Sequence, residues 1–168
     1  MNRRRVIRTS RRAAGFTLIE LVVSLALLGV LAMVAMPVAE LSWQRDREVE
    51  LRAALRELRT AIDAYRQASD AGLIAKSPDA SGYPPSLEVL VEGVRNQRDP
   101  KGRTLVFLRR IPRDPFHTDP AVPAERTWTV RAYGALPGER SAGRSADVWD
   151  VQSASPRAGL NGVPLRQW

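Results

Sequence analysis

An uncharged apolar stretch over residues 21–39 constrains this chain more than any other feature. Ser24 is its one polar residue, and no charged residue interrupts it. At a rise of about 1.5 Å per residue, a helix of this length spans most of a hydrocarbon layer roughly 30 Å thick. Glu20 stands immediately before the stretch. An ionised carboxylate at the edge of such a layer costs on the order of a few kcal/mol unless it is paired, so its presence needs a physical reason.

The basic charge of the chain is concentrated just ahead of this stretch. Residues 1–15 contain six arginines and no acidic residue. The whole chain has 26 basic and 18 acidic residues and a net charge of +8, so without those six arginines 20 basic residues face 18 acidic ones. Arginines beside an apolar segment follow the positive-inside pattern of membrane insertion. Nucleic-acid binding, which needs basic charge on the folded domain itself, is therefore not expected.

Three interpretations of this N-terminus compete. A secretory signal peptide would have a shorter apolar region followed by a small-residue cleavage site, and Val38-Ala39-Glu40 is a poor version of that site. Ser10-Arg11-Arg12 hints at a twin-arginine export signal, although Ala13-Ala14-Gly15 separates it from the first hydrophobic residue. In the third interpretation the chain is cut between Gly15 and Phe16, so the apolar segment stays in the mature protein.

A family resemblance favours the third interpretation. The hexapeptide Gly15-Phe16-Thr17-Leu18-Ile19-Glu20, the arginine-rich leader and Pro37 together resemble the class III signal of type IV pilins and type II secretion pseudopilins. The resemblance implies cleavage after Gly15 by a membrane aspartic peptidase, which also methylates the new amino group of Phe16. It further implies single-pass insertion in the inner membrane, with the C-terminal domain in the periplasm.

The same resemblance supplies a role for Glu20 in assembly and axial register. Phe16 and Glu20 are four residues apart, which places the free amine and the carboxylate on one face of a helix. The resemblance implies that in a filament the acid of one subunit meets the amine of its neighbour. Such pairing offsets the desolvation of both charges and fixes the register, because a slipped subunit leaves both unpaired. The alternative is an interfacial carboxylate that reaches toward lipid headgroups.

Past the apolar stretch the helical pattern continues but changes character. Pro37 removes one backbone donor and is expected to kink the helix or open it locally. Residues 43–67 are densely charged, with Glu48 and Arg52 placed as a favourable i,i+4 pair. Apolar residues nevertheless recur at steps of four, three, four and three: Leu51, Leu55, Leu58, Ile62 and Tyr65.

This spacing predicts an amphipathic helix whose apolar stripe needs a cover. A lone coiled coil is the alternative, but the repeat is short for one. We expect one continuous helix from residue 16 to about residue 68, ended by Asp70-Ala71-Gly72.

The remaining residues predict a small domain of helix and strand. The chain has no cysteine, which excludes disulfides and thiolate metal sites. Ser86 is expected to cap a short helix over residues 87–92 that stops at Gly93, and residues 95–103 are expected to be polar and exposed. Three segments are predicted to be strands: residues 104–108, 127–133 and 148–151. The predicted fold class is α+β and pilin-like, with a long N-terminal helix packed on a small antiparallel sheet of about three strands.

The order of the downstream motifs resembles one branch of this family, the major pseudopilins of type II secretion of the protein G type. These motifs are Tyr83-Pro84 with Ser86-Leu87-Glu88-Val89-Leu90, then Arg110-Ile111-Pro112-Arg113-Asp114-Pro115-Phe116, then Pro137-Gly138, then Asp147-Val148-Trp149. Both of the following motifs have a purely structural alternative. Tyr83-Pro84 would be a loop anchor, and Arg113-Asp114 would be an ion pair within a turn.

The resemblance divides the chain into a leader (residues 1–15), a transmembrane and filament-core helix (16–39) and a periplasmic pseudopilin domain (40–168). It implies a homopolymer that also contacts other pseudopilins, the prepilin peptidase and methyltransferase, the inner-membrane secretion platform and membrane lipid.

One departure from the family concerns calcium. Major pseudopilins typically bind a calcium ion with aspartates in the loop after the last strand, whereas residues 151–168 have no carboxylate side chain. Calcium takes six to eight oxygen ligands, some of them usually charged, so Asp147 and Asp150 with backbone carbonyls and Asn161 make a weak set. Calcium is therefore possible but disfavoured, and no metal is predicted. Leu160 and Trp168 are expected to pin the C-terminal loop by apolar contact instead.

The sequence gives no support for an enzyme. The single histidine, His117, lies in a predicted turn, and neither a Gly-rich phosphate loop nor a nucleophile elbow is present. The predicted function is a structural subunit of the type II secretion pseudopilus, cleaved and N-methylated, then polymerised to drive protein export across the outer membrane. The alternative is a minor or priming pseudopilin, or a type IV pilin with a binding role. Glu20 favours the stacking subunit, because one minor class of the family lacks this acid.

Overall fold

The computed structural model describes residues 15–78, 80–135 and 147–168, and for residues 34–39 it describes the backbone without the side chains. The predicted Pro137-Gly138 turn lies outside these residues. Contacts divide the chain into two compact units, Met1–Ser42 and Trp43–Trp168. Each unit is described by itself.

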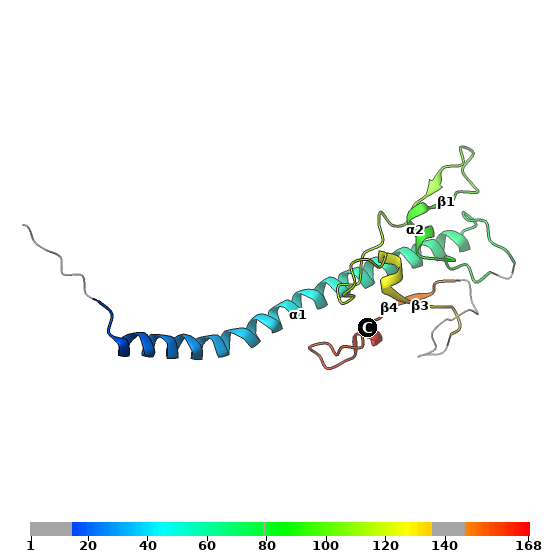
Figure 1. Ribbon diagram of the computed structural model, residues 1–168. Coiled ribbons are helices and arrows are strands. Elements are labelled where there is room, and N and C mark those ends of the chain that lie inside the picture. Colours follow the sequence, from blue (N-terminus) through cyan, green and yellow to red (C-terminus); the bar gives the residue numbers. More distant parts are fainter. Residues whose placement is uncertain (1–14, 79, 136–146) are drawn as a thin grey trace, which may run out of the picture. The chain divides into compact units, whose positions relative to one another are not determined.

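The long helix α1 extends from Leu18 to Asp70 and is the dominant element of the chain (Figure 1). It begins where the hydroxyl of Thr17 accepts the backbone N–H of Glu20 at 3.3 Å and so satisfies one of the free donors of the first turn. It ends where Gly72 adopts a φ of 68° and the N–H of Leu73 donates to the carbonyl of Ala68 at 2.9 Å. The predicted continuous helix is confirmed to within two residues at each end. Pro37 lies within α1, and the kink expected there stays a prediction because its side chain lies outside the described residues.

The described residues of the first unit are almost entirely the apolar part of α1. Their large side chains are exposed in the single chain, from Val23 at 49% to Leu18 at 82%. In the part of the chain that the structure describes, no helix is long and apolar enough to cross a membrane. A continuous apolar surface of this kind is typical of a contact surface.

The second half of α1 supports the core of the second unit. Leu51 and Leu58 are fully buried, and Ile62 is 1% exposed. Leu55 and Tyr65 are also buried, so the predicted stripe is confirmed. Later segments of the chain cover it with apolar side chains, among them Leu87, Leu90, Leu108, Phe116, Trp128, Val151 and Leu165. Burial of each large aliphatic side chain stabilises the fold by about 1.5–3 kcal/mol, which makes the stripe a principal source of stability for this unit.

The short helix α2 (Glu88–Glu92) was predicted correctly, but its cap was not. Its N-cap residue is Leu87, which makes no side-chain capping bond. The hydroxyl of Ser86 is instead bonded to the carboxylate of Glu88, and this bond is the main cause that lowers the pKa of Glu88. The helix ends as predicted at Gly93, which has a φ of 79°.

Within residues 15–78, 80–135 and 147–168, four short strands form two separate two-stranded sheets where one sheet of about three strands was predicted. In the first, β1 (Val94–Arg95) pairs antiparallel with β2 (Thr104–Leu105). In the second, β3 (Trp128–Arg131) pairs antiparallel with β4 (Asp150–Ser153), with Val130 opposite Val151. The α+β class is confirmed. The three predicted strand segments overlap β2, β3 and β4, but their bounds differ, β1 was not predicted, and within the described residues the strands form two sheets and not one.

Competing backbone hydrogen bonds explain the shortened strands. The N–H groups of Phe107 and Leu108 both donate to the carbonyl of Leu90, at 3.0 and 2.9 Å, so the chain leaves the ladder after Leu105. The N–H of Val148 donates to the carbonyl of Pro84 at 2.7 Å, and β4 starts only two residues later. Because these partners are distant in sequence, alternation of residue types could not reveal them.

The strand β1 ends at Arg95, the first residue of the segment that was predicted to be polar and exposed. Gly93 permits its pairing, because a Cβ at this position would lie 2.7 Å from the carbonyl oxygen of Leu105 and 2.6 Å from Thr104 Cγ2. The described residues also contain two short 3-10 helices, η1 (Ala124–Thr127) and η2 (Leu165–Gln167).

Truncation of the buried stripe should destabilise the second unit. Leu58→Ala is expected to lower the free energy of unfolding by about 2–5 kcal/mol, because it leaves a cavity between α1 and its cover. Val49→Ala, at a position 56% exposed on the same helix, should change it by less than about 0.5 kcal/mol. Urea unfolding of the detergent-extracted chain, followed by tryptophan fluorescence, measures both. Equal losses in the two variants would contradict the assignment of the stripe.

Candidate functional site

The Gly15–Phe16 bond lies in the segment that precedes α1, where both residues are exposed to solvent. Residues 15–17 have no regular structure, and Phe16 is 80% exposed. No atom of the residues that the structure describes lies within 4 Å of the position that a Cβ on Gly15 would take. A peptidase needs an accessible, non-helical segment, and this bond lies in one. Cleavage after Gly15 and methylation of Phe16 stay predictions.

Glu20 lies in the first turn of α1, where a carboxylate is favoured. The partial positive charge of a helix N-terminus stabilises an acidic residue by roughly 0.3–1 kcal/mol at an exposed site. Thr17 and Glu20 also have the spacing of a capping box, and the half of it that the structure shows is the 3.3 Å bond from the Glu20 N–H to the Thr17 hydroxyl. Glu20 is exposed in the single chain. Its carboxylate is therefore accessible to a group from another molecule.

In the second unit, Glu48 attaches the C-terminal segment (residues 150–168) to α1. This side chain is 3% exposed, and Oε1 accepts the backbone N–H of Leu160 at 2.7 Å. The amide of Gln44 donates to the same oxygen at 3.1 Å, and the guanidinium of Arg52 lies 3.6 Å from Oε2. The predicted pair of Glu48 and Arg52 is confirmed. The side chain of Leu160 is 46% exposed, so the prediction that it pins the loop by apolar contact is wrong: its backbone N–H makes the contact.

Trp168 does pin the C-terminal segment, as predicted. Its ring packs against the buried core, and the guanidinium of Arg52 lies over it at 4.3 Å from the ring centroid. Gly159 approaches the same ring so closely that a Cβ would lie 2.5 Å from Trp168 Cζ2. A larger residue at 159 would therefore displace the tryptophan.

Arg59, near the middle of the buried stripe, contacts three separate points of the C-terminal segment. Its Nε lies 2.8 Å from Asp150 Oδ1. Its terminal nitrogen donates to the main-chain oxygens of Val151, at 3.2 Å, and Trp168, at 2.8 Å. Arg131 lies 3.7 Å from the second oxygen of Asp150. Asp150 is thus flanked by two guanidinium groups.

These contacts leave a poor donor set for calcium. Besides the paired Asp150, Asp147 accepts the N–H of Tyr133 at 3.1 Å, and the side-chain oxygen of Asn161 accepts the N–H of Val163 at 3.1 Å. Across the described residues, no cluster of three histidine or carboxylate side chains is placed to hold a metal ion. Two guanidinium charges beside Asp150 also repel a cation. The residues present do not fit the calcium ion that the family resemblance implies.

The Arg113-Asp114 turn is a buried polar junction and not the ion pair that was considered. Asp114 is 1% exposed, and its carboxylate accepts the N–H of Phe116 at 2.8 Å and the hydroxyl of Ser153 at 2.6 Å. Its own N–H donates to the hydroxyl of Thr127 at 3.1 Å. Arg113 points elsewhere, to the main-chain oxygens of Asp119 and Val122. The motif therefore joins a turn to β4.

Tyr83 also has a structural position. Its ring stacks on that of Tyr133, with the centroids 5.4 Å apart, and the guanidinium of Arg66 lies 5.0 Å from its centroid. Tyr83-Pro84 is thus a loop anchor in the single chain.

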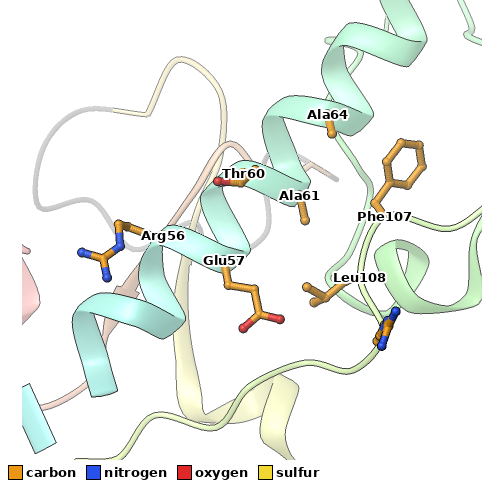
Figure 2. A pocket seen from close by; sticks show the side chains of 8 residues that line it. Arg56, Glu57, Thr60, Ala61, Ala64, Phe107 and Leu108 are labelled. Atoms are coloured by element: carbon orange, nitrogen blue, oxygen red, sulfur yellow. The ribbon is translucent and has the colours of Figure 1, made fainter. Parts of the chain in front are cut away.

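The surface of the second unit, in its described part, has recesses. The larger, of about 450 Å³, lies between α1 and residues 107–109 and has Arg56, Glu57 and Arg109 among its lining (Figure 2). The smaller, of about 250 Å³, has Glu88, Glu125, Arg126 and Asp147 in its wall. Neither lining combines a nucleophile with a histidine base, and both are open hollows.

Comparison with known proteins agrees with the N-terminal geometry. Residues 10–36 match the prokaryotic N-terminal methylation motif. The chain is 29% identical over 152 residues to the type II secretion system core protein G of Vibrio cholerae, which covers 84% of this chain and 95% of that protein. No solved structure matches the chain.

Removal of the buried carboxylate at the Asp114 junction should weaken the fold. Asp114→Ala leaves the Phe116 N–H and the Ser153 hydroxyl without their partner, and is expected to lower the free energy of unfolding by about 2–3 kcal/mol. Asp114→Asn, which keeps one acceptor oxygen, should fall between this variant and the wild type. Asp63→Ala, at an exposed position on α1, should change it by less than about 0.5 kcal/mol. Chemical denaturation measures all three, and equal stabilities of the two alanine variants would rule out the junction.

Proposed function

We propose that this chain, which belongs to the type II secretion pseudopilins of the protein G type, is the repeating structural subunit of a pseudopilus and not an enzyme. The N-terminal methylation motif at residues 10–36 and the similarity to a core protein G over most of the chain support the family. The observation that carries the proposal is an apolar, exposed helix with one carboxylate, Glu20, in its first turn.

The proposed maturation begins with the arginine-rich leader on the cytoplasmic side of the inner membrane. A prepilin peptidase cuts the exposed Gly15–Phe16 bond, and the new amino group of Phe16 is methylated. Residues 16–39 then anchor the subunit in the lipid as a single pass, with residues 40–168 in the periplasm. The apolar composition of residues 21–39 and the positive-inside charge of the leader support this topology.

Assembly transfers the apolar helix from lipid to a bundle of neighbouring copies. The large side chains that are 49–82% exposed in the single chain would be covered there. Glu20 would pair with the methylated amine of Phe16 on the next subunit, which offsets the desolvation of both groups. The inner-membrane secretion platform and other pseudopilins are the further partners proposed for this step.

The major subunit is favoured over a minor or priming one. A helical polymer of identical copies needs the same acid and amine on every subunit, and this chain has both candidates, Glu20 and Phe16. The similarity extends to 95% of a core protein G, which supports the same assignment. Growth of the polymer against the outer-membrane channel would then drive protein export.

The mature N-terminus tests the maturation step. Mass spectrometry of the membrane-extracted protein is expected to find a chain that starts at Phe16 and carries one additional methyl group. A peptidase-deficient strain, in which the full leader should be retained, is the control. A mature chain that starts beyond residue 39 would overturn the proposal.

Substitution of Glu20 tests the assembly step. Glu20→Ala and Glu20→Leu are expected to leave membrane insertion unchanged, because they remove a charge from an apolar helix, and to abolish filament formation. Glu40→Ala, which removes a carboxylate at the opposite end of the apolar stretch, is the matched control and should assemble. Membrane fractionation and electron microscopy of overexpressed subunits measure the two steps. Normal filaments from either Glu20 variant would exclude the pairing.

A further inference from the structure

We infer that arginine and carboxylate contacts between α1 and the C-terminal segment take the structural place of a bound calcium ion, so that the fold of this domain does not depend on calcium. These contacts, which we call the polar clamp, are made by Arg59 and Glu48 on α1. The inference rests on the family assignment for its contrast with calcium. It does not require the subunit to assemble.

Arg59 does what a cation would do in this position. It gathers three oxygens that belong to different parts of the chain: a carboxylate oxygen of Asp150 at 2.8 Å and the main-chain oxygens of Val151 and Trp168 at 3.2 and 2.8 Å. A bound calcium ion likewise joins carboxylate and main-chain oxygens. The planar guanidinium carries its own positive charge and several fixed donors, so it can hold such a group of oxygens without a metal.

Glu48 forms the second half of the clamp, on the same helix. Burial of a carboxylate is costly unless its oxygens are hydrogen-bonded. Here Oε1 accepts the N–H of Leu160, and the Gln44 amide also contributes a bond, while Arg52 lies beside Oε2. Gln44 additionally donates to the carbonyl of Ala158 at 3.3 Å. The loop that precedes Trp168 is thus held by side chains of α1.

The same arrangement disfavours a metal ion. Asp150 is the carboxylate nearest to the expected calcium loop, and it has Arg59 on one oxygen and Arg131 on the other. A calcium ion would have to displace at least one guanidinium, and residues 151–168 have no carboxylate side chain that could compensate. Arg59 and a calcium ion therefore compete for the same carboxylate oxygen of Asp150.

Thermal unfolding of the wild-type full chain in detergent, below the concentration at which it polymerises, tests the exclusion. Its Tm in excess EGTA is expected to equal its Tm in millimolar calcium chloride within about 1 °C. Isothermal titration with calcium chloride alone should show no saturable binding. A Tm that falls by several degrees in EGTA and recovers with calcium would overturn the inference. This measurement does not depend on filament formation, so its failure is distinguishable from failure of the proposed function.

Substitutions of Arg59 test the clamp itself. Arg59→Gln is expected to lower the Tm by roughly 3–8 °C, because the charge and most of the three bonds are lost. Arg59→Lys, which keeps the charge but reaches fewer acceptors, should lower it by less. Arg56→Gln removes an exposed arginine from the same helix and should leave the Tm within about 1 °C.

Equal Tm values for Arg59→Gln and Arg56→Gln would overturn the clamp even if calcium had no effect. Restoration of the Arg59→Gln Tm by calcium, with no effect of calcium on the wild type, would support the inference, because the ion would then occupy the place from which the guanidinium excludes it. If Arg59→Gln does not accumulate as folded protein, a wild-type Tm unaffected by EGTA together with a lowered Tm of Arg59→Lys supports the inference, and a Tm of Arg59→Lys equal to that of the wild type contradicts it.

Discussion

Burial of the stripe on the second half of α1 is the interaction on which the fold of the second unit depends. Leu51, Leu58 and Ile62 are covered almost completely, although the regular elements in the rest of the unit, as far as it is described, are short. Two-stranded sheets are marginally stable by themselves. The helix therefore supplies the continuous apolar surface, and the loops, α2 and the four short strands are held by packing against it. A change in the stripe should consequently affect every part of the unit.

Buried polar groups then determine how the loops and strands of the second unit are arranged on the apolar stripe of α1. Asp114 fixes a turn to Ser153, Glu48 fixes the chain at Leu160, and Arg59 fixes β4 and Trp168. Each of these groups has its partners within the described residues, so their burial need not destabilise the fold. A hydrophobic stripe alone is non-directional, and directional bonds of this kind select one arrangement of loops among many.

The sequence was most informative where a single periodicity governs a long segment. The steps between Leu51 and Tyr65 predicted the buried face of α1, and Gly93 correctly marked the end of α2. The strands were predicted less well, because their lengths depend on competing bonds such as those from Phe107 and Leu108 to the carbonyl of Leu90.

The contacts of Glu48 and Arg59 with residues 150–168 were not predicted. In the sequence, Glu48 and Arg59 look like charged residues on the solvent-exposed face of a helix. Only the folded position of the C-terminal segment shows that each has a partner distant in sequence. Trp168 was correctly expected to pack against the core, because a large apolar ring gains free energy when it is buried. For Leu160 the backbone, and not the apolar side chain, makes the contact, which no pattern of residue types can reveal.

The proposed function places two demands on α1: its second half supports the fold of the domain, and its first half, with exposed apolar side chains, would join subunits through Glu20. Carbodiimide cross-linking of filaments formed from an equal mixture of isotopically light and heavy subunits tests this second demand most directly. The account predicts a zero-length amide between the amino group of Phe16 and the carboxylate of Glu20, with mixed light and heavy peptides in the cross-linked product. Filaments in which Glu20 is cross-linked only within its own subunit, or not to Phe16 at all, would contradict it.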